Sequence, residues 1–366
     1  MLAGGAGTRF WPASRAARPK QLLPLLGGEP LITATARRVL PLCARGGSDG
    51  WERIWIATGK HLVAPTRAAL PDVSGRRLLV EPVPRNTAPC IGWAAATIAR
   101  EDPDAIVLVL PSDHHIADVP RFLEVLEAAV ASARGGAITT IGIRPTHPET
   151  GFGYIEVAEA GAGSAAPREV LRFVEKPSRE RAAEFLASGR FLWNAGMFIF
   201  RAGDMRAAIR AHLPALAEGL DEIDRAAALG AAGEAEVIER MFPRLPAVSI
   251  DHGVMEHVGG LAVVPGDFGW SDLGSWQSAW ELAEKDERGN SAPAGSVLVD
   301  AHGNYLVDLS ARAGDADDRR VIALVGVEDL VVVETDDALL IVPRDRAQDV
   351  KHVVDALKAR GQGRHT

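Results

Sequence analysis

The feature that most constrains this chain is a regular alternation of short apolar runs with longer amphipathic stretches over its first two thirds. The apolar runs are bounded by glycine, proline or polar residues, and they lie at Ile54–Thr58, Leu78–Glu81, Ala105–Leu110 and Ile138–Ile143. Helical patterns lie between them at Leu31–Leu42, Pro89–Arg100 and Pro120–Arg134. This alternation predicts an α/β fold with a Rossmann-like, mostly parallel sheet covered on both faces. Ligands of such sheets bind at the carboxyl ends of the strands.

The pattern changes twice further along the chain. Between Tyr154 and Phe200, short strand patterns surround a helical stretch, which predicts a mixed-sheet insertion that forms one wall of a pocket. After about Asp286 a run of short strands ends in the amphipathic stretch Asp345–Lys358. Strands that follow an α/β region predict a separate small β domain. We therefore predict one domain over residues 1–285 and a second, with a C-terminal helix, over residues 286–366.

Composition excludes several classes of protein. The 366 residues include 40 Lys and Arg against 48 Asp and Glu, a net charge of −8, so no positive field favours binding to nucleic acid. Only two cysteines are present, which excludes a disulfide framework and favours a reducing compartment, the cytoplasm. No apolar run approaches the ~20 residues of a membrane span, so we expect no membrane partner.

The first candidate for chemistry is the glycine-rich segment at the start of the chain, Leu2-Ala3-Gly4-Gly5-Ala6-Gly7-Thr8-Arg9, with Lys20 shortly after it. Glycines let backbone N–H groups approach a phosphate closely, and the two cations supply charge. The segment is neither a P-loop nor a dinucleotide fingerprint. An ordinary glycine-rich turn is the alternative interpretation.

The second candidate is the segment from Glu81 to Pro89, between a predicted strand and a predicted helix. Asn86 or Thr87 can cap that helix, which is a purely structural role. A polar side chain at this position can instead hydrogen-bond a base edge.

Two aspartates are candidates for binding a cation. Asp113 follows the apolar run Ala105–Leu110, and Asp272 lies in the small polar segment Gly269–Trp276. Two carboxylates together with substrate phosphates are the usual way of holding Mg²⁺. A turn-capping aspartate is the alternative for Asp113, and His114 and His115 lack the spacing of a zinc site.

Taken together, these segments resemble the sugar-1-phosphate nucleotidyltransferases, and among them the enzymes that make GDP-mannose from GTP and mannose 1-phosphate. The resemblance covers nearly the whole chain, in order, at Leu2–Arg9, Pro19–Gln21, Glu81–Pro89, Gly151–Ile155, Phe173–Pro177, Trp193–Phe198 and Ile250–Glu256. Ser112 and His252 depart from the family, where Ala and Tyr are common.

The resemblance implies a Mg²⁺-assisted transfer of GMP and a role for each matching residue. The implied catalytic residues are Arg9, Lys20, Asp113 and Asp272, of which the two aspartates hold Mg²⁺. The implied nucleotide-binding residues are Leu2, Ala3, Gly4, Gly5, Gly7, Thr8, Glu81, Arg85, Asn86, Thr87 and Ser112. The implied sugar-phosphate residues are Gly153, Glu175, Lys176, Asn194 and Asp251, in a sugar-side wall formed by residues 153–200 and 245–275.

The resemblance also implies that the C-terminal β domain is a left-handed β-helix that joins two copies into a homodimer. Two alternatives stay open for the function. One is a guanylyltransferase for another hexose 1-phosphate, and the other is a catalytically silent sensor of nucleotide sugars.

The start of the chain carries a further expectation. In such a fold the glycine-rich loop follows a central strand of about five or six apolar residues, but only Met1 and Leu2 precede Ala3. We therefore expect the native protein to begin several residues upstream. The alternative is that a neighbouring segment fills the gap.

Overall fold

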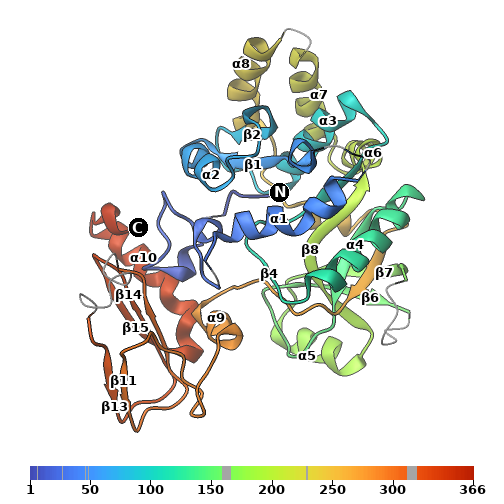
Figure 1. The fold of residues 1–366 in the computed structure, drawn as a ribbon. Coiled ribbons are helices and arrows are strands. Elements are labelled where there is room, and N and C mark those ends of the chain that lie inside the picture. The colour runs from blue at the N-terminus through green and yellow to red at the C-terminus, as the bar shows by residue number, and fades with distance from the viewer. Residues whose placement is uncertain are drawn as a thin grey trace.

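The computed structural model describes residues 1–5, 7–26, 28–45, 47, 49–158, 166–227, 230–310 and 320–366. An α/β region with helices packed around its strands lies beside a smaller, β-rich C-terminal region (Figure 1). This arrangement confirms the predicted fold class. None of the described helices is long and apolar enough to cross a membrane.

The α/β region contains a six-stranded sheet and a separate two-stranded one. The larger sheet has the order β3 (Ile106–Val109), β8 (Phe191–Arg201), β5 (Thr139–Ile143), β9 (Ala262–Gly266), β7 (Arg168–Glu175) and β6 (Gly153–Val157). The smaller sheet is the parallel pair β1 (Ile56–Gly59) and β2 (Leu78–Glu81). Leu2 forms parallel bridges to Ala57 and Pro111, so it links β1 to the end of β3.

The strand directions agree with the predicted parallel sheet except at β8 and β7. β5 and β9 run parallel, and β8 lies antiparallel between β3 and β5. The sequence pattern predicts that the short strands up to Phe200 belong to a mixed-sheet insertion, but β8 is a long strand that lies within the main sheet. The physical reason is that nearly every side chain of β8 is buried, which suits a strand with neighbours on both sides and both faces covered.

Helices cover both faces of the sheet. The helices of the α/β region are α1 (Leu31–Cys43), α2 (Val63–Ala69), α3 (Thr87–Glu101), α4 (Val119–Arg134), α5 (Arg179–Ser188), α6 (Ala202–His212), α7 (Pro214–Ala227) and α8 (Ala231–Met241), of which α8 packs on α7. On one face, Val125 of α4 packs in a cluster with Ile141 and Val264. On the other face, α3, α6 and α7 share a cluster with Phe200 and Val263.

The C-terminal region begins after α9 (Trp276–Leu282). Two parallel pairs form there, β11 (Val297–Val299) with β13 (Ala323–Val325) and β12 (Tyr305–Asp308) with β14 (Leu330–Glu334), and β15 (Leu339–Pro343) pairs antiparallel to β14. The last long element is α10 (Val350–Ala359). The left-handed β-helix and the boundary near residue 285 stay predictions.

Candidate active site

The glycine-rich loop is fixed at the carboxyl ends of β1 and β3. The Leu2 N–H donates to the Leu110 carbonyl at 2.9 Å, and the Ala3 N–H donates to the Ala57 carbonyl at 2.8 Å. The Ser112 hydroxyl donates to the Leu2 carbonyl at 2.7 Å. Ser112, predicted to bind nucleotide, therefore uses its hydroxyl to hold the loop.

Gly7 brings Lys20 against this loop. Gly7 has a φ of +58°, and a Cβ added there would lie 2.5 Å from the Lys20 Cβ atom. Only glycine satisfies both conditions, since side chains rarely adopt this backbone conformation and no space exists for one. The close approach explains why the sequence requires glycine at this position.

A cavity of about 340 Å³ opens beside the loop, and the four residues predicted as catalytic all line it. They are Arg9, Lys20, Asp113 and Asp272. The short antiparallel pair of β4 (His115–Ile116) and β10 (Trp270–Ser271) brings the two aspartates together, because Ser271 pairs with His115. Segments far apart in the sequence thus meet at one cavity, which we call the phosphate pocket.

Lys20 lies between the two aspartates. Its side chain is almost fully buried, and its Nζ atom lies 2.9 Å from the Asp113 Oδ2 atom and 2.5 Å from the Asp272 carbonyl oxygen. Burial, the largest single influence, would raise the pKa of Asp113, but the attraction and hydrogen bond of Lys20, together with the nearby His114 and a backbone hydrogen bond, outweigh it, so the pKa is lowered. For Asp272, burial dominates and the nearby Asp113 charge adds to it, so the pKa is raised although Lys20 opposes this.

His114 lines the same pocket but supports its wall. Burial lowers the pKa of His114 to about 4, despite attraction by Asp113. The Trp270 Nε1–H donates to the His114 Nδ1 atom at 3.1 Å, and the two rings form an edge-on contact. The neutral ring therefore positions Trp270.

The residues of the segment Glu81–Pro89 that are predicted to bind the nucleotide fall into two groups, one beside the glycine-rich loop and one at the start of α3. Glu81 is buried, and its Oε2 atom lies 3.4 Å from the position of a Cβ added at Gly4 of the loop. Burial raises the pKa of Glu81 to about 7.

The other group has visible structural roles. The Asn86 side chain caps α3 by accepting from the Thr87 N–H at 2.9 Å. The Thr87 hydroxyl accepts from the Ile250 N–H at 2.9 Å, which fixes the chain just before Asp251. Arg85 is half-buried, and its Nε–H has no partner among the described residues.

The predicted sugar-side residues form a second cluster. The Asn194 amide donates to the Asp251 Oδ1 atom at 2.9 Å, and the Lys176 Nζ atom lies 2.8 Å from the Glu175 Oε1 atom. A Cβ added at Gly153 would lie 2.6 Å from the Glu175 Oε2 atom and 3.3 Å from the Asn194 Cβ atom. Glycine at position 153 thus lets both side chains converge.

Burial raises the pKa of Asp251 to about 6, and repulsion by Glu175 adds to the shift. The positive charges and hydrogen bonds around this carboxylate do not offset its burial, so it favours a ligand that donates hydrogen bonds to it. Hydroxyl groups of a sugar have this property.

Sequence reasoning missed three residues at these sites. The Thr140 hydroxyl donates to the Asn194 Oδ1 atom at 3.0 Å, and the Glu256 Oε1 atom accepts from the Glu175 N–H at 3.1 Å. Glu256 lies in the same segment as Asp251, so proximity along the chain was an available signal. Lys351 lines the phosphate pocket from α10, and no local pattern marks it.

Comparisons with known proteins agree with this geometry. Residues 1–289 match the family described as "Nucleotidyl transferase". The chain belongs to the nucleotidyl transferase family. Residues 307–357 of this nucleotidyltransferase match a second family, described as "MannoseP isomerase/GMP-like beta-helix domain".

Similar proteins cover nearly the whole nucleotidyltransferase. "Xanthan biosynthesis protein XanB" of Xanthomonas campestris pv. campestris (strain B100) is 41% identical over 100% of this chain and 74% of its own length. "Mannose-1-phosphate guanylyltransferase" of Klebsiella pneumoniae is 38% identical over 98% of this chain and 73% of its own. A crystal structure from Thermus thermophilus, described as a "mannose-1-phosphate geranyltransferase", has a TM-score of 0.83 at 35% identity and covers 98% of both chains.

Proposed function

We propose that this nucleotidyltransferase transfers GMP from GTP to α-D-mannose 1-phosphate and gives GDP-mannose and pyrophosphate. The observation that carries the proposal is the phosphate pocket, where a glycine-rich loop, Arg9, Lys20 and two aspartates converge. Relatives named mannose-1-phosphate guanylyltransferase, 37–38% identical over nearly the whole chain, support it.

The reaction needs positioning and charge neutralisation more than a protein base. An oxygen of the sugar phosphate attacks the α-phosphorus of GTP, and the bond to the β-phosphate oxygen breaks as pyrophosphate leaves. The attacking phosphate is already ionised at pH 7, so no side chain has to remove a proton. The loop N–H groups of Gly4, Gly5, Gly7 and Thr8 would bind the triphosphate, and Arg9 and Lys20 would neutralise its charge.

Nucleotidyltransferases of this kind generally use a divalent metal ion, and we assign Mg²⁺ to Asp113 and Asp272. The donor set fits, because two carboxylates line one cavity and a hard cation that binds two carboxylates completes its shell with phosphate oxygens. When bound there, Mg²⁺ would lower the cost of bringing two anionic substrates together.

Glu81 is the residue that we propose selects guanine. It is buried next to the loop at Gly4, and a carboxylate can accept from N–H groups that guanine carries and uracil and thymine do not present in the same pattern. A buried acceptor left without its donors is costly, so bases that lack them are rejected.

At the sugar end, the carboxylates of Glu175 and Asp251 would accept hydrogen bonds from mannose hydroxyls, and the Asn194 amide would accept or donate them. Lys176 would lie near the sugar phosphate. Their convergence at Gly153 supports a compact polar site of this kind. We propose that the reaction takes place in the cytoplasm, as the scarcity of cysteine favours.

The decisive experiment is a pyrophosphate-release assay of the purified protein with four nucleoside triphosphates and several hexose 1-phosphates. We expect GTP with mannose 1-phosphate to give the highest kcat/KM. Equal or better turnover of UTP would refute the guanine assignment. A higher kcat/KM with another hexose would favour the alternative substrate, and nucleotide-sugar binding without turnover would favour the sensor.

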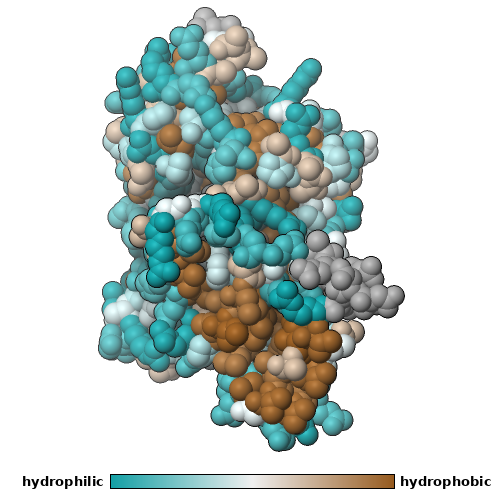
Figure 2. Space-filling model, turned by 90° about the vertical axis from the view of Figure 1, so that its left-hand side faces the viewer, coloured by the Kyte–Doolittle hydropathy of each residue, from teal (hydrophilic) through white to brown (hydrophobic). Residues whose placement is uncertain are grey.

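We also propose a homodimer formed through the C-terminal β region. Figure 2 shows an apolar patch over the lower part of this region. Its exposed side chains include Val297, Val299, Val325, Leu339 and Ile341, and Val325 is 68% exposed. Because the valines of β11 and β13 alternate toward one face, a twofold axis can place this face against itself in a second copy.

Light scattering at micromolar concentration tests the dimer. We expect a dimeric mass for the protein and a monomeric mass for the variant Val299→Asp/Val325→Asp, while Leu171→Asp, an exposed apolar residue of β7, stays dimeric. A monomeric mass for the unmodified protein would contradict the proposal.

A further inference from the structure

Lys351 of the C-terminal region lies in the phosphate pocket. It is the second residue of α10 and shares the cavity with Arg9, Lys20 and the two aspartates. The helix is held at this position because Val350 and Val354 are buried in a cluster with Phe10. The start of α10 thus packs directly against the turn Thr8–Phe10, which follows the glycine-rich loop.

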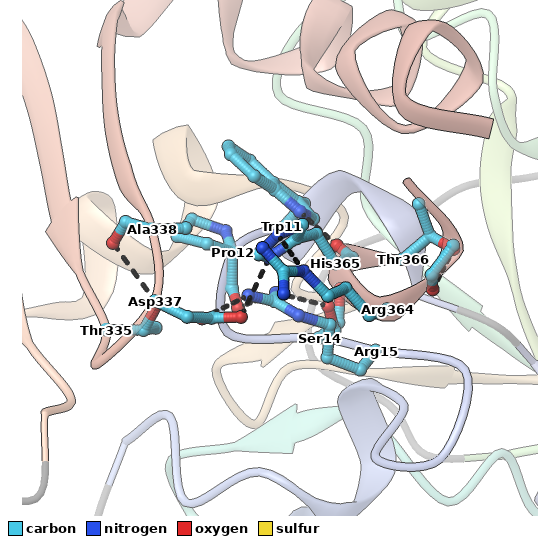
Figure 3. Close-up of polar contacts among 11 residues, drawn as sticks. Trp11, Pro12, Ser14, Arg15, Thr335, Asp337, Ala338, Arg364, His365 and Thr366 are labelled. Atoms are coloured by element: carbon cyan, nitrogen blue, oxygen red, sulfur yellow. Dashed lines mark hydrogen bonds and ion pairs between the residues drawn. The ribbon is translucent and has the colours of Figure 1, made fainter. Parts of the chain in front are cut away.

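Polar contacts fix the end of the chain to the same segment (Figure 3). The Trp11 Nε1–H donates to the His365 carbonyl at 2.7 Å, and the Ala16 N–H donates to the Thr366 carbonyl at 3.2 Å. Arg15 forms an ion pair at 3.0 Å with Asp337, in the turn between β14 and β15. These contacts hold the C-terminal region against residues 11–16, and so help to keep α10 and Lys351 beside the pocket.

The charges that line the pocket indicate why Lys351 matters for binding an anion. Before a metal ion binds, the charges of Arg9 and Lys20 are cancelled by those of the two ionised aspartates, so the pocket would be neutral without Lys351. Lys351 is exposed, and among the described residues it takes part in no ion pair or side-chain hydrogen bond. Its ammonium group is available for an anion.

We propose that Lys351 binds the phosphates of the substrate and the leaving pyrophosphate. This inference rests on the proposed function, because it assigns a phosphate-binding residue to that site. The C-terminal region then completes the pocket and does more than join two copies.

The test is the direct binding of inorganic pyrophosphate, with Mg²⁺, to the full-length protein by titration calorimetry. We expect Lys351→Ala to weaken binding at least 10-fold, Lys351→Arg to restore most of it, and Lys358→Ala, on the last turn of the same helix, to bind normally. Equal affinities for the Lys351→Ala and Lys358→Ala variants would overturn the inference. Normal pyrophosphate binding by a protein that makes no GDP-mannose would instead refute the proposed function.

A second and independent observation is a cavity of about 950 Å³ between β1 and β3, on the opposite side of Leu2 from the phosphate pocket. Apolar side chains dominate its walls, among them Val39, Leu79, Ile91, Val107 and Val130. We call this cavity the strand groove.

The strand groove separates two strand edges that face each other. The other edge of β1 pairs with β2, and the other edge of β3 pairs with β8. Among the residues that the structure describes, only Met1–Ala3 form a ladder between the facing edges. In it the Ala57 N–H donates to the Met1 carbonyl at 2.9 Å, and the Met1 amine donates to the Trp55 carbonyl at 2.6 Å.

The hydrogen-bond register shows which backbone groups face the groove. The Ala202 N–H donates to the Ala105 carbonyl, and pairing alternates along an antiparallel ladder, so odd-numbered residues of β3 bond to β8. The even-numbered residues Ile106 and Leu108 therefore direct their N–H and C=O groups into the groove, as Leu110 does toward Leu2. Backbone groups along such an unpaired strand edge are a ready template for pairing with a further extended segment.

We propose that the strand groove binds an extended apolar segment of about five residues joined to Met1, which runs parallel to β1 and β3. The residue joined to Met1 would donate to the Leu108 carbonyl and accept from the Leu110 N–H, and so continue the ladder that Leu2 begins. Burial lowers the pKa of the Met1 amine to about 6, so replacing this amine with a neutral peptide N–H also favours the joined segment.

The test compares two N-terminal extensions of the full chain, Val-Ile-Val-Ile-Val and a matched one with proline at the positions that should donate to Ile106 and Leu108. We expect the first to raise Tm by at least about 5 °C above that of the second, because only the first can donate to both carbonyl groups and complete the ladder between β1 and β3. The same extension should slow hydrogen exchange at the Leu108 and Leu110 amides. Equal Tm values for the two extensions, or unchanged exchange at both amides, would contradict the proposal.

Discussion

The pKa values of two carboxyl groups, Asp113 at the phosphate end and Asp251 at the sugar end, shift in opposite directions. At the phosphate end, Lys20 lies 2.9 Å from Asp113, and its attraction and hydrogen bond, together with the nearby His114 and a backbone hydrogen bond, outweigh burial and lower the pKa of Asp113. At the sugar end, burial and repulsion by Glu175 raise the pKa of Asp251 to about 6, and the nearby Lys176 forms its ion pair with Glu175.

The difference reflects the substrates that we propose for each end. A phosphate end must hold cations among carboxylates and receive anions, so ion pairs there are useful before substrate arrives. A sugar end receives neutral hydroxyl groups, so its carboxylates keep unused acceptor capacity. We therefore expect changes at the phosphate end to slow the chemical step and changes at the sugar end to weaken sugar binding.

The largest effect is expected for Asp113→Asn and Asp272→Asn. Each removes one electrostatic stabiliser of the transition state, which costs at least ~2–3 kcal/mol, or about 100-fold in kcat. Steady-state rates at saturating Mg²⁺ measure this, with the exposed Asp72→Asn as the matched control. Near-normal rates for both variants would eliminate the metal assignment.

A smaller effect, confined to one substrate, is expected for Asn194→Ala. The change removes a hydrogen-bonding group from the sugar end and frees Asp251 from its 2.9 Å contact. We expect KM for mannose 1-phosphate to rise about 10-fold, in line with the loss of a hydrogen bond to a charged group, while KM for GTP changes little. A comparable rise in both KM values would show that the two ends are not separate.

The smallest effect is a pH dependence of the sugar end. The pKa of Asp251 is about 6, so Asp251 becomes protonated and loses acceptor capacity as the pH falls through 6. The charged groups that face it are Glu175 and Lys176. We expect kcat/KM for mannose 1-phosphate to fall below pH 6, toward tenfold per unit, and Asp251→Asn to lower the value but remove this break. An unchanged break in the variant would assign it to another group.

The same pKa predicts a change in stability. A raised carboxyl pKa contributes stability that is present below the unfolded value near 4 and is lost as the pH rises through about 6. Asp251→Asn should therefore raise Tm more at pH 8 than at pH 4, as measured by calorimetry. An equal change at both values would argue against a buried, poorly compensated carboxylate.

Local patterns sufficed to predict much of the fold. The strand Leu78–Glu81 and the start of α1 at Leu31 lie where predicted, because turn residues and apolar runs mark them clearly. The place of β8 in the sheet was not predictable in the same way, since strand order depends on long-range packing. The short α2 was also missed, as its seven residues are too few for a periodic pattern.

In the candidate site, too, some residues could be predicted from local sequence and others depend on long-range packing. Asp113 could be selected from sequence because it follows an apolar run, and Asp272 because it lies in a segment of small and polar residues. Their roles stay predictions. Lys351 could not be selected in this way, because it belongs to an ordinary amphipathic helix and gains its meaning only where α10 packs against Phe10. The cap made by Asn86 was foreseen as an alternative, and the structure shows it.

The most direct test of the central claim is to follow the purified protein with GTP, mannose 1-phosphate and Mg²⁺ by phosphorus NMR. The proposed reaction gives the two coupled signals of the GDP-mannose diphosphate and the single signal of pyrophosphate, which grow in equal molar amounts as both substrates disappear. Conversion of GTP to GDP or GMP without a sugar nucleotide, or no reaction at all, would contradict it.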